Sequence, residues 1–370
     1  MLAICPDSFM RDYWQKKPCV LRAALPDFND LLDENELAGL AMEPELDSRI
    51  VRFHNNQWSM IQGPFEEFSA CEGKWTLLVQ GVDKYLDDAS ELMSQFNFIP
   101  NWRVDDLMIS YAVEGAGVGP HVDQYDVFLV QGKGSRRWRV GPPKSSVARP
   151  PAAGLCQVEP FEPIIDCELS SGDILYIPPG WPHDGSTIVS ALTYSIGFRA
   201  PDQAQLAGYL AEHMQSAESL PARYTDPALP ATEAPVSINR NEITQLKTLL
   251  HNAIDDNAFT FTLLKLLSEQ GLEPEPVDAD MLTKQLQQHI DNGGLIIKHP
   301  GCRPILCDDY TGWCFVNGEA IEFAQVNHPV MRNLMAKSTI SRADMTLAPD
   351  DLDIFCTFAR LINMGYWGYR

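Results

Sequence analysis

The sequence predicts a mixed α/β protein whose first part is a β-barrel or double-sheet jelly roll and whose later part is mainly helical. Between about residues 50 and 200, short apolar runs alternate with Gly/Pro turns such as Gly115-Ala116-Gly117 and Gly132-Lys133-Gly134. Regular short strands with such turns are typical of barrels and jelly rolls. Beyond residue 200, leucines recur at the spacing of amphipathic helices.

The individual elements follow from local patterns. An N-terminal helix is predicted to end near Pro18, because proline interrupts helical hydrogen bonding. Further helices are expected at 203–216 and, as one or two segments, at 239–269. The central Asn317-Gly318 of segment 313–323 suits a type I′ turn and predicts a hairpin. Strands are predicted at residues 107–113, 122–131, 136–140, 173–177 and 191–198.

The net charge of the chain limits which macromolecules it is expected to bind. The chain has 28 Lys and Arg against 50 Asp and Glu, a formal net charge of −22. Such a surface repels nucleic acids and anionic membranes, so direct nucleic-acid binding is not expected. A basic protein, such as a ribosomal protein, is the macromolecular partner that this charge favours.

Cysteine usage and hydropathy indicate the cellular compartment in which the protein is expected. Nine cysteines without a repeated spacing argue against a disulfide framework and for a reducing environment. The N-terminus lacks the basic start and long apolar run of a signal peptide, and no stretch approaches the ~20 apolar residues of a membrane helix. We therefore expect a soluble, cytoplasmic protein.

The most informative segment is 172–183, Gly172-Asp-Ile-Leu-Tyr-Ile-Pro-Pro-Gly-Trp-Pro-His183. It combines a glycine, a buried apolar strand, a tight Pro/Gly turn and a histidine immediately afterwards. Upstream, His121-Val122-Asp123 stands on a segment that also looks like a strand. A His-x-Asp is expected about once by chance in such a chain, but the two motifs in this order form a strong joint signal.

His121, Asp123 and His183 are a candidate metal site. Two imidazoles and one carboxylate are the ligands that hold Fe(II) on one face and leave the opposite positions open for oxygen chemistry. Arg136 lies downstream on a predicted strand, where alternation places it on the same face as Trp138 and Val140. An inward arginine is costly unless it meets an anion, and a guanidinium suits the distal end of a dicarboxylate.

These residues together resemble the Jumonji-C subfamily of Fe(II)/2-oxoglutarate dioxygenases. The whole chain is similar to the bacterial ribosomal oxygenases, and the clearest local signature is 119–128, Gly-Pro-His-Val-Asp-Gln-Tyr-Asp-Val-Phe. The resemblance implies hydroxylation of an arginine side-chain carbon of a large-subunit ribosomal protein, L sixteen. It also implies a cupin-type double-stranded β-helix, a helical dimerisation region and a C-terminal winged helix. On this basis we expect domains at 1–200, 201–275 and 276–370, and a homodimer.

The resemblance also implies roles at the site. His121, Asp123 and His183 would hold Fe(II), with 2-oxoglutarate as cosubstrate and O2 as oxidant. Arg136 would pair with the far carboxylate of the cosubstrate, and Ser110 and Thr193, chosen by strand parity, could add hydrogen bonds there. One position departs from the general cupin pattern, which would place asparagine where Thr187 stands.

A substrate arginine needs an acidic and partly aromatic slot. Gln124, Tyr125 and Asp126 follow the metal motif directly, and Glu114 precedes it on the adjacent loop. Strand alternation requires at least one of Tyr125 and Asp126 to point inward. We expect both to line the pocket, with Gln124 and Glu114 as further candidates.

Other functions fit parts of the pattern. A cupin isomerase or small-molecule dioxygenase would keep the barrel, but an isomerase would commonly show His-x-His rather than His121-Val122-Asp123. A non-catalytic binding module would not need an intact ligand set. Demethylation of N-methyl-lysine uses the same oxidant and is opposed only by the family resemblance. The C-terminal 281–370 holds eight Lys and Arg against nine Asp and Glu, which favours protein contacts over nucleic-acid binding.

Overall fold

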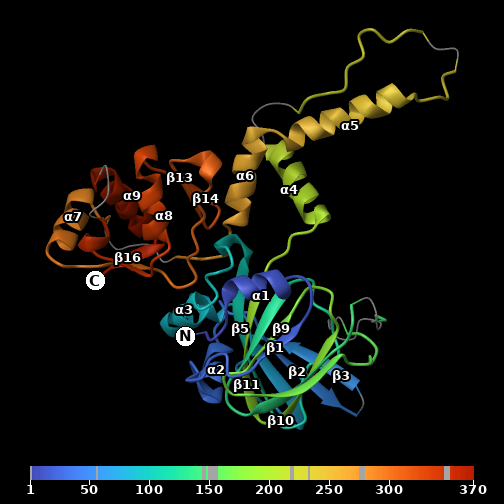
Figure 1. Cartoon of the computed structure of the whole chain (residues 1–370), viewed down its shortest axis with the longest axis vertical. Helices are drawn as coiled ribbons and strands as arrows, with labels where there is room; N and C mark the ends of the chain where they lie inside the picture. Colours follow the sequence, from blue (N-terminus) through green and yellow to red (C-terminus); the bar gives the residue numbers. More distant parts are fainter. Residues whose placement is uncertain are drawn as a thin grey trace. The chain divides into compact units, whose positions relative to one another are not determined.

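The protein divides into two compact units, which are described separately. The structure, a computed structural model, describes residues 2–55, 57–143, 147–148, 157–216, 221–231, 234–274, 280–345 and 351–370. The first unit comprises Met1–Ala200 with Lys298–Gly301, and the second comprises Pro201–Ile297 with Cys302–Arg370 (Figure 1). The predicted boundary between residues 275 and 276 lies outside the described residues.

Two antiparallel sheets build the first unit. The larger has eight strands in the order β1-β9-β6-β11-β5-β4-β2-β3, and the smaller has three in the order β10-β7-β8. The strands are β1 Cys19–Leu21, β2 Ser48–His54, β3 Gln57–Gln62, β4 Lys74–Val79, β5 Val104–Ala112, β6 Asp126–Gln131, β7 Ser135–Val140, β8 Ile165–Ser170, β9 Ile174–Ile177, β10 His183–Val189 and β11 Ala191–Phe198. A mixed α/β fold with a large antiparallel sheet is thus confirmed.

The two faces of the large sheet have different functions. One face packs against α1 (Pro6–Asp12), α2 (Glu34–Leu40) and α3 (Asp87–Ser94) to form the main apolar core. The helix α2 begins at a capping box, in which Asp33 and Glu36 each accept a hydrogen bond from the other's backbone N–H. The other face is apposed to the small sheet, and a smaller apolar cluster that includes Leu129 and Trp138 lies there. The candidate site opens between the two sheets.

Most predicted strands are present with small shifts. The strand predicted at 191–198 is confirmed as β11. The other predicted strands shift by a few residues at their ends: 107–113 is part of β5, 136–140 is β7 and 173–177 is β9. The prediction that a strand begins at residue 122 was wrong, because β6 begins only at Asp126. His121 pairs instead in isolated bridges with Gln157 and His183. Metal-motif residues 122–125 therefore lie in a connecting segment.

The expectation that Asp126 lines the pocket was also wrong. Along β6, Asp126 shares a face with Phe128 and Val130, which belong to the main core, whereas Val127 and Leu129 face the cavity. The Asp126 carboxylate is fully buried and accepts hydrogen bonds from Gln15 at 3.0 Å, Arg103 at 2.9 Å and Tyr176 at 2.6 Å. Burial raises its pKa. Asp126 is therefore a structural carboxylate behind the site.

The second unit is mainly helical. Its helices are α4 Gln203–Ser216, α5 Arg240–Ile254, α6 Asn257–Leu267, α7 Thr283–Asp291, α8 His328–Met335 and α9 Asp351–Asn363. Its strands are β12 Ile296–Lys298, β13 Trp313–Val316, β14 Glu319–Glu322, β15 Thr339–Ile340 and β16 Trp367–Tyr369. The hairpin prediction is confirmed as β13–β14, with positive φ at Asn317 (46°) and Gly318 (83°) as a type I′ turn requires.

In the described parts of the chain, no helix combines the length and the apolar character needed to cross a bilayer.

The hydrogen bonds that Asp126 accepts from Gln15, Arg103 and Tyr176 should contribute to the stability of the fold. Replacing Asp126 by Ala leaves the Arg103 guanidinium and the Tyr176 hydroxyl without this acceptor, so we expect the free energy of unfolding to fall by about 3 kcal/mol. Chemical denaturation measures this change. The matched control is Asp166→Ala, which removes an exposed partner of Arg137 on β8 and should change stability far less. Equal effects of the two substitutions would contradict the network's structural role.

Candidate active site

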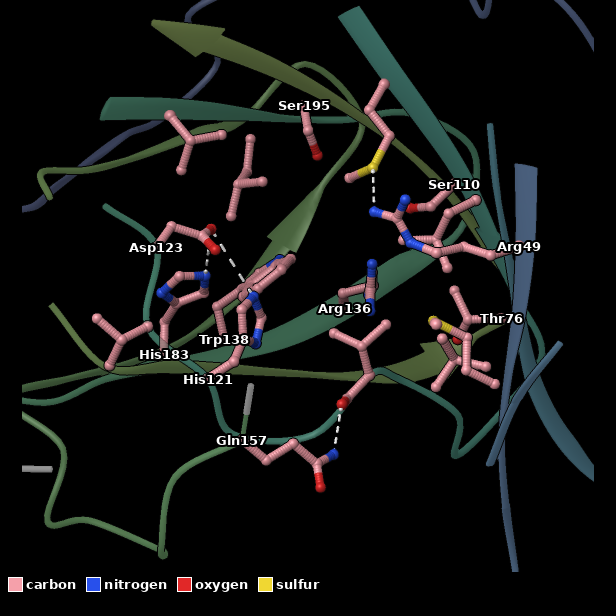
Figure 2. Close-up of a pocket in the computed structure, with 18 of the residues that line it drawn as sticks. Arg49, Thr76, Ser110, His121, Asp123, Arg136, Trp138, Gln157, His183 and Ser195 are labelled. Atoms are coloured by element: carbon pink, nitrogen blue, oxygen red, sulfur yellow. Dashed lines mark hydrogen bonds and ion pairs between the residues drawn. The ribbon is translucent and has the colours of Figure 1, made fainter. Parts of the chain in front are cut away.

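The three predicted metal ligands converge. One ligand atom each from His121, Asp123 and His183 lie within 4.8 Å of one another, and this is the only such group of His, Cys, Asp and Glu found among the described residues. The His121 and Asp123 side chains approach to 3.8 Å, and those of His183 and Asp123 to 3.5 Å. Figure 2 shows the three side chains at one side of the pocket, with Arg136 nearer its middle.

Local backbone pairing brings the two histidines together. The N–H of His121 donates to the carbonyl of His183 at 3.0 Å, and the N–H of His183 donates back at 2.9 Å. The Pro/Gly turn before His183 is held by Gly180, whose N–H donates to the Asp123 carbonyl at 2.8 Å. Gly180 has φ of 79°, a conformation that favours glycine. The two sequence motifs are therefore joined by main-chain hydrogen bonds.

Both imidazoles are oriented for metal binding through Nε2. Nδ1 of His121 lies 2.9 Å from the carbonyl of Gly119, and Nδ1 of His183 lies 3.0 Å from the carbonyl of Trp181. Because a carbonyl only accepts, these contacts fix the proton on Nδ1 and leave the Nε2 lone pair free to ligate. In each case the acceptor is two residues earlier in the chain.

The electrostatics of the triad also suit a cation. Burial, followed by the neighbouring His183, lowers the pKa of His121 and so favours the neutral imidazole that binds metal. Burial alone would raise the pKa of Asp123, but the neighbouring His183 and His121 side chains lower it to about 2. Asp123 is therefore ionised at neutral pH. A divalent metal would meet two neutral nitrogens and one carboxylate.

Arg136 lies on the inner face of β7, as alternation predicted. Its side chain is buried and lines the cavity, while Arg137 and Arg139 are exposed. The guanidinium donates to the Thr193 hydroxyl and to the Gly185 carbonyl, each at 3.3 Å. Burial lowers the pKa of Arg136 to about 10, so it remains cationic at neutral pH. Its Nε has no hydrogen-bond partner among the described residues.

Ser110 and Thr193 flank Arg136 on the large sheet. They are directly paired across β5 and β11, and both are buried. Ser110 lines the cavity, and Thr193 reaches it through its hydrogen bond to Arg136. Thr187, at the position where the cupin pattern would place asparagine, is paired across β10 and β7 with Arg136. Its buried hydroxyl has no hydrogen-bond partner among the described residues.

Of the four residues predicted to bind the substrate arginine, only one lines the cavity. Tyr125 lines the cavity, and its hydroxyl is hydrogen-bonded to Asp123. Gln124 and Glu114 are exposed, and neither belongs to the lining of the cavity. Asp126 lies on the opposite face of the sheet, as described above.

The structure adds residues that sequence reasoning missed. The cavity, of about 360 Å³, is also lined by Arg49, Met108, Trp138, Gln157 and Ser195. Asp106 alternates onto the same face of β5 as Met108 and Ser110 but does not line the cavity itself; its carboxylate accepts a hydrogen bond from the Gly81 N–H at 3.0 Å, and its charge acts on Tyr125. Burial, and then Asp83 and Asp105, raise the pKa of Asp106 to about 7. Strand parity with Ser110 was the signal that could have found Asp106.

This geometry defines a class of protein. Two histidines and a carboxylate in a cavity between two antiparallel sheets, with a buried arginine beyond them, fit a metal-dependent oxygenase that uses an anionic cosubstrate. Residues 91–206 match the JmjC domain, a span that includes the triad and Arg136.

Comparison of the whole chain is more specific. The chain is 37% identical to the ribosomal protein uL16 3-hydroxylase of Escherichia coli over 99% of its length and 97% of that protein. A probable ribosomal oxygenase of Haemophilus influenzae is 39% identical over 55% of the chain and 52% of that protein. The structure of the E. coli ribosomal oxygenase YcfD in complex with cobalt and 2-oxoglutarate superposes with a TM-score of 0.89, at 35% identity, covering 100% of this chain and 99% of that chain. The chain therefore belongs to the ribosomal oxygenase family.

Proposed function

We propose that this protein is an Fe(II)- and 2-oxoglutarate-dependent hydroxylase of an arginine side chain in the large-subunit ribosomal protein uL16. The observation that carries the proposal is the convergence of His121, Asp123 and His183 beside a buried cationic Arg136. It is supported by the full-length similarity to a uL16 3-hydroxylase and to a structure containing cobalt and 2-oxoglutarate. When bound, iron and the cosubstrate supply the oxidising chemistry that hydroxylates an unactivated C–H bond.

The residues of this chain position the reactants. The triad presents its ligand atoms to one point, and Arg136 with Ser110 and Thr193 offers donors to the far carboxylate of the cosubstrate. The buried hydroxyl of Thr187, which is paired with Arg136 across β10 and β7, has no hydrogen-bond partner among the described residues. The apolar residues Val127 and Leu129 line the wall of the cavity and limit water near the reacting groups.

The substrate arginine is proposed to enter along the face of β5 that carries Asp106 and Met108. Met108 is paired with Ser195 on β11, and Tyr125 lies on the neighbouring wall. This wall offers apolar contact for the arginine stem, a hydroxyl, and a carboxylate for the guanidinium. Gln124 and Glu114 remain candidates for contacts outside the cavity.

The arrangement of the remaining chain is also proposed. Residues 201–275 would form a homodimer, because α5 buries none of its side chains and carries Ile243, Leu246, Leu250 and Ile254 exposed on one face. Residues 276–370, with the β13–β14 hairpin beside α7, α8 and α9, would form a winged helix that contacts protein and not nucleic acid. We propose a cytoplasmic location, where uL16 is available.

The function is tested by intact-mass spectrometry of unmodified large-subunit ribosomal proteins incubated with the enzyme, Fe(II) and 2-oxoglutarate. We expect uL16 alone to gain one oxygen atom, with one succinate formed for each hydroxylation. His121→Ala should abolish both, because it removes a metal ligand. Succinate without a mass gain on uL16 would contradict the substrate, loss of a methyl group would indicate demethylation, and neither product would favour a binding module.

The raised pKa of Asp106 predicts how catalysis depends on pH. Its pKa of about 7 means that the carboxyl is neutral below this pH and charged above it. Guanidinium binding requires the charged form, so kcat/KM for a uL16 peptide should rise as pH rises through about 7. Asp106→Asn should remove this step and lower kcat/KM at pH 8 by about tenfold or more. Glu168→Gln, on the exposed side of β8, is the matched control, and an unaltered pH profile in Asp106→Asn would overturn the assignment.

The proposed dimer predicts a change of mass in solution. Sedimentation equilibrium should give the mass of two chains, and Leu250→Lys on the exposed face of α5 should give that of one chain, since a buried unpaired charge opposes association. Glu242→Lys, at the N-terminal end of α5, is a charge-changing control for the same helix. A single-chain mass for the unmodified protein would contradict the proposal.

A further inference from the structure

Arg49 is a second arginine at the wall of the cavity, besides Arg136. It lies on β2, where alternation places it on the same face as Val51, and both residues line the cavity. The side chain of Arg49 is 26% exposed, so it is within reach of solvent and of a ligand. Figure 2 shows Arg49 extending into the pocket from the side opposite the metal triad.

Much of the hydrogen-bonding capacity of Arg49 is unused. One terminal nitrogen donates to the side-chain oxygen of Gln80 at 3.2 Å and lies 3.7 Å from the Asp47 carboxylate. The other terminal nitrogen donates to the sulfur of Met108 at 3.6 Å, and a thioether is a weak acceptor. A guanidinium carries five N–H donors. The two hydrogen bonds that Arg49 makes within the described part of the chain therefore leave donors for a ligand.

Strand pairing separates Arg49 from the residues proposed to bind the cosubstrate. Direct pairs connect β11, β5, β4 and β2 into one row across the large sheet, in the order Thr193, Ser110, Leu78 and Arg49. Arg136 donates to Thr193 at one end of this row, whereas the backbone of Arg49 stands at the other end, about 14 Å away by the spacing of strands. The two arginines thus enter the cavity from opposite ends of the row, and Arg49 remains for another part of the ligands.

The guanidinium of Arg49 lies at the wall proposed for the substrate arginine. Its hydrogen bond to sulfur goes to Met108, which precedes Ser110 by two residues and so lies about 7 Å from it along β5. The charge of Arg49 also acts on Tyr125, on the neighbouring wall. A cation here repels a cationic side chain, so Arg49 favours substrate binding only through an oxygen acceptor elsewhere on the same peptide. Main-chain carbonyls beside the arginine are acceptors that every peptide carries.

We propose that Arg49 is a substrate-binding residue whose guanidinium donates a hydrogen bond to a main-chain carbonyl oxygen of the uL16 segment beside the hydroxylated arginine. This assignment rests on the proposed function and adds a contact with the peptide backbone to the contacts with its side chain. The carbonyl takes the place of the Met108 sulfur as acceptor, and it is the stronger acceptor of the two. The contact anchors the peptide main chain while the arginine stem extends along Met108.

The test compares peptide affinities without turnover. Fluorescence anisotropy of a labelled uL16 peptide that contains the arginine, added to protein loaded with Mn(II) and 2-oxoglutarate, gives the Kd for the unmodified chain and for Arg49→Met. This variant keeps an unbranched stem and loses the donors, so we expect the Kd for the peptide to rise about tenfold or more. Charge repulsion alone predicts the reverse, because loss of a cation favours a cationic peptide. The Kd for 2-oxoglutarate should stay unchanged.

The matched control is Arg137→Met on the exposed face of β7. It makes the same change of charge and of side chain outside the cavity, where Arg137 pairs with Asp166. It should leave the Kd values for the peptide and for 2-oxoglutarate unchanged.

Thioamide peptides separate a direct contact from a structural role. Exchange of a carbonyl oxygen for sulfur weakens the acceptor, so at one peptide bond beside the arginine it should raise the Kd with the unmodified protein and have little further effect with Arg49→Met. Such non-additivity is expected of two groups in contact. Additive effects at every peptide bond tested, an unchanged or lower Kd for the peptide with Arg49→Met, or an equal loss of affinity for the peptide and 2-oxoglutarate would each overturn the assignment. Failure of the unmodified, loaded protein to bind the peptide would instead overturn the proposed function, and the assignment with it.

Discussion

The pair of main-chain hydrogen bonds between His121 and His183 is the constraint on which the site depends. It joins a loop before β6 to the first residue of β10, and so fixes two ligands from distant parts of the chain relative to each other. Each imidazole is then oriented by the carbonyl two residues before it, at Gly119 and at Trp181. The ligand geometry therefore follows mainly from the backbone, whose hydrogen bonds form part of the fold itself. A site built in this way is arranged before the metal arrives.

A second constraint is the buried charge of Arg136. Its two hydrogen-bond acceptors, the Thr193 hydroxyl and the Gly185 carbonyl, are neutral, and its pKa is lowered by burial. Burying a cation without a directly bonded carboxylate destabilises a fold. A bound dianion would offset this cost, so the buried charge of Arg136 would strengthen the binding of an anionic cosubstrate. The hydroxyl of Thr187 and the N–H of Trp138, which have no hydrogen-bond partner within the described part of the chain, belong to neighbouring residues of the same two strands.

The two faces of β6 show how one strand separates stability from function. Val127 and Leu129 face the cavity, whereas Asp126 joins Arg103, Gln15 and Tyr176 in the core behind it. The two carboxylates Asp123 and Asp126 are three residues apart in sequence and have different roles. Asp123 is held ionised for a metal, and Asp126 closes a buried network that positions the strand.

The sequence by itself determined the strand-rich first part, the hairpin at Asn317-Gly318 and the identity of the triad with Arg136. Each of these depends on short-range chemistry: period-two alternation, the positive φ of a type I′ turn, and a ligand set that few side chains can provide. Tertiary structure decided the role of Asp126 and the surroundings of Asp106. A carboxylate next to a metal motif can face either side of a sheet, and only the start of β6 at residue 126 fixes which side.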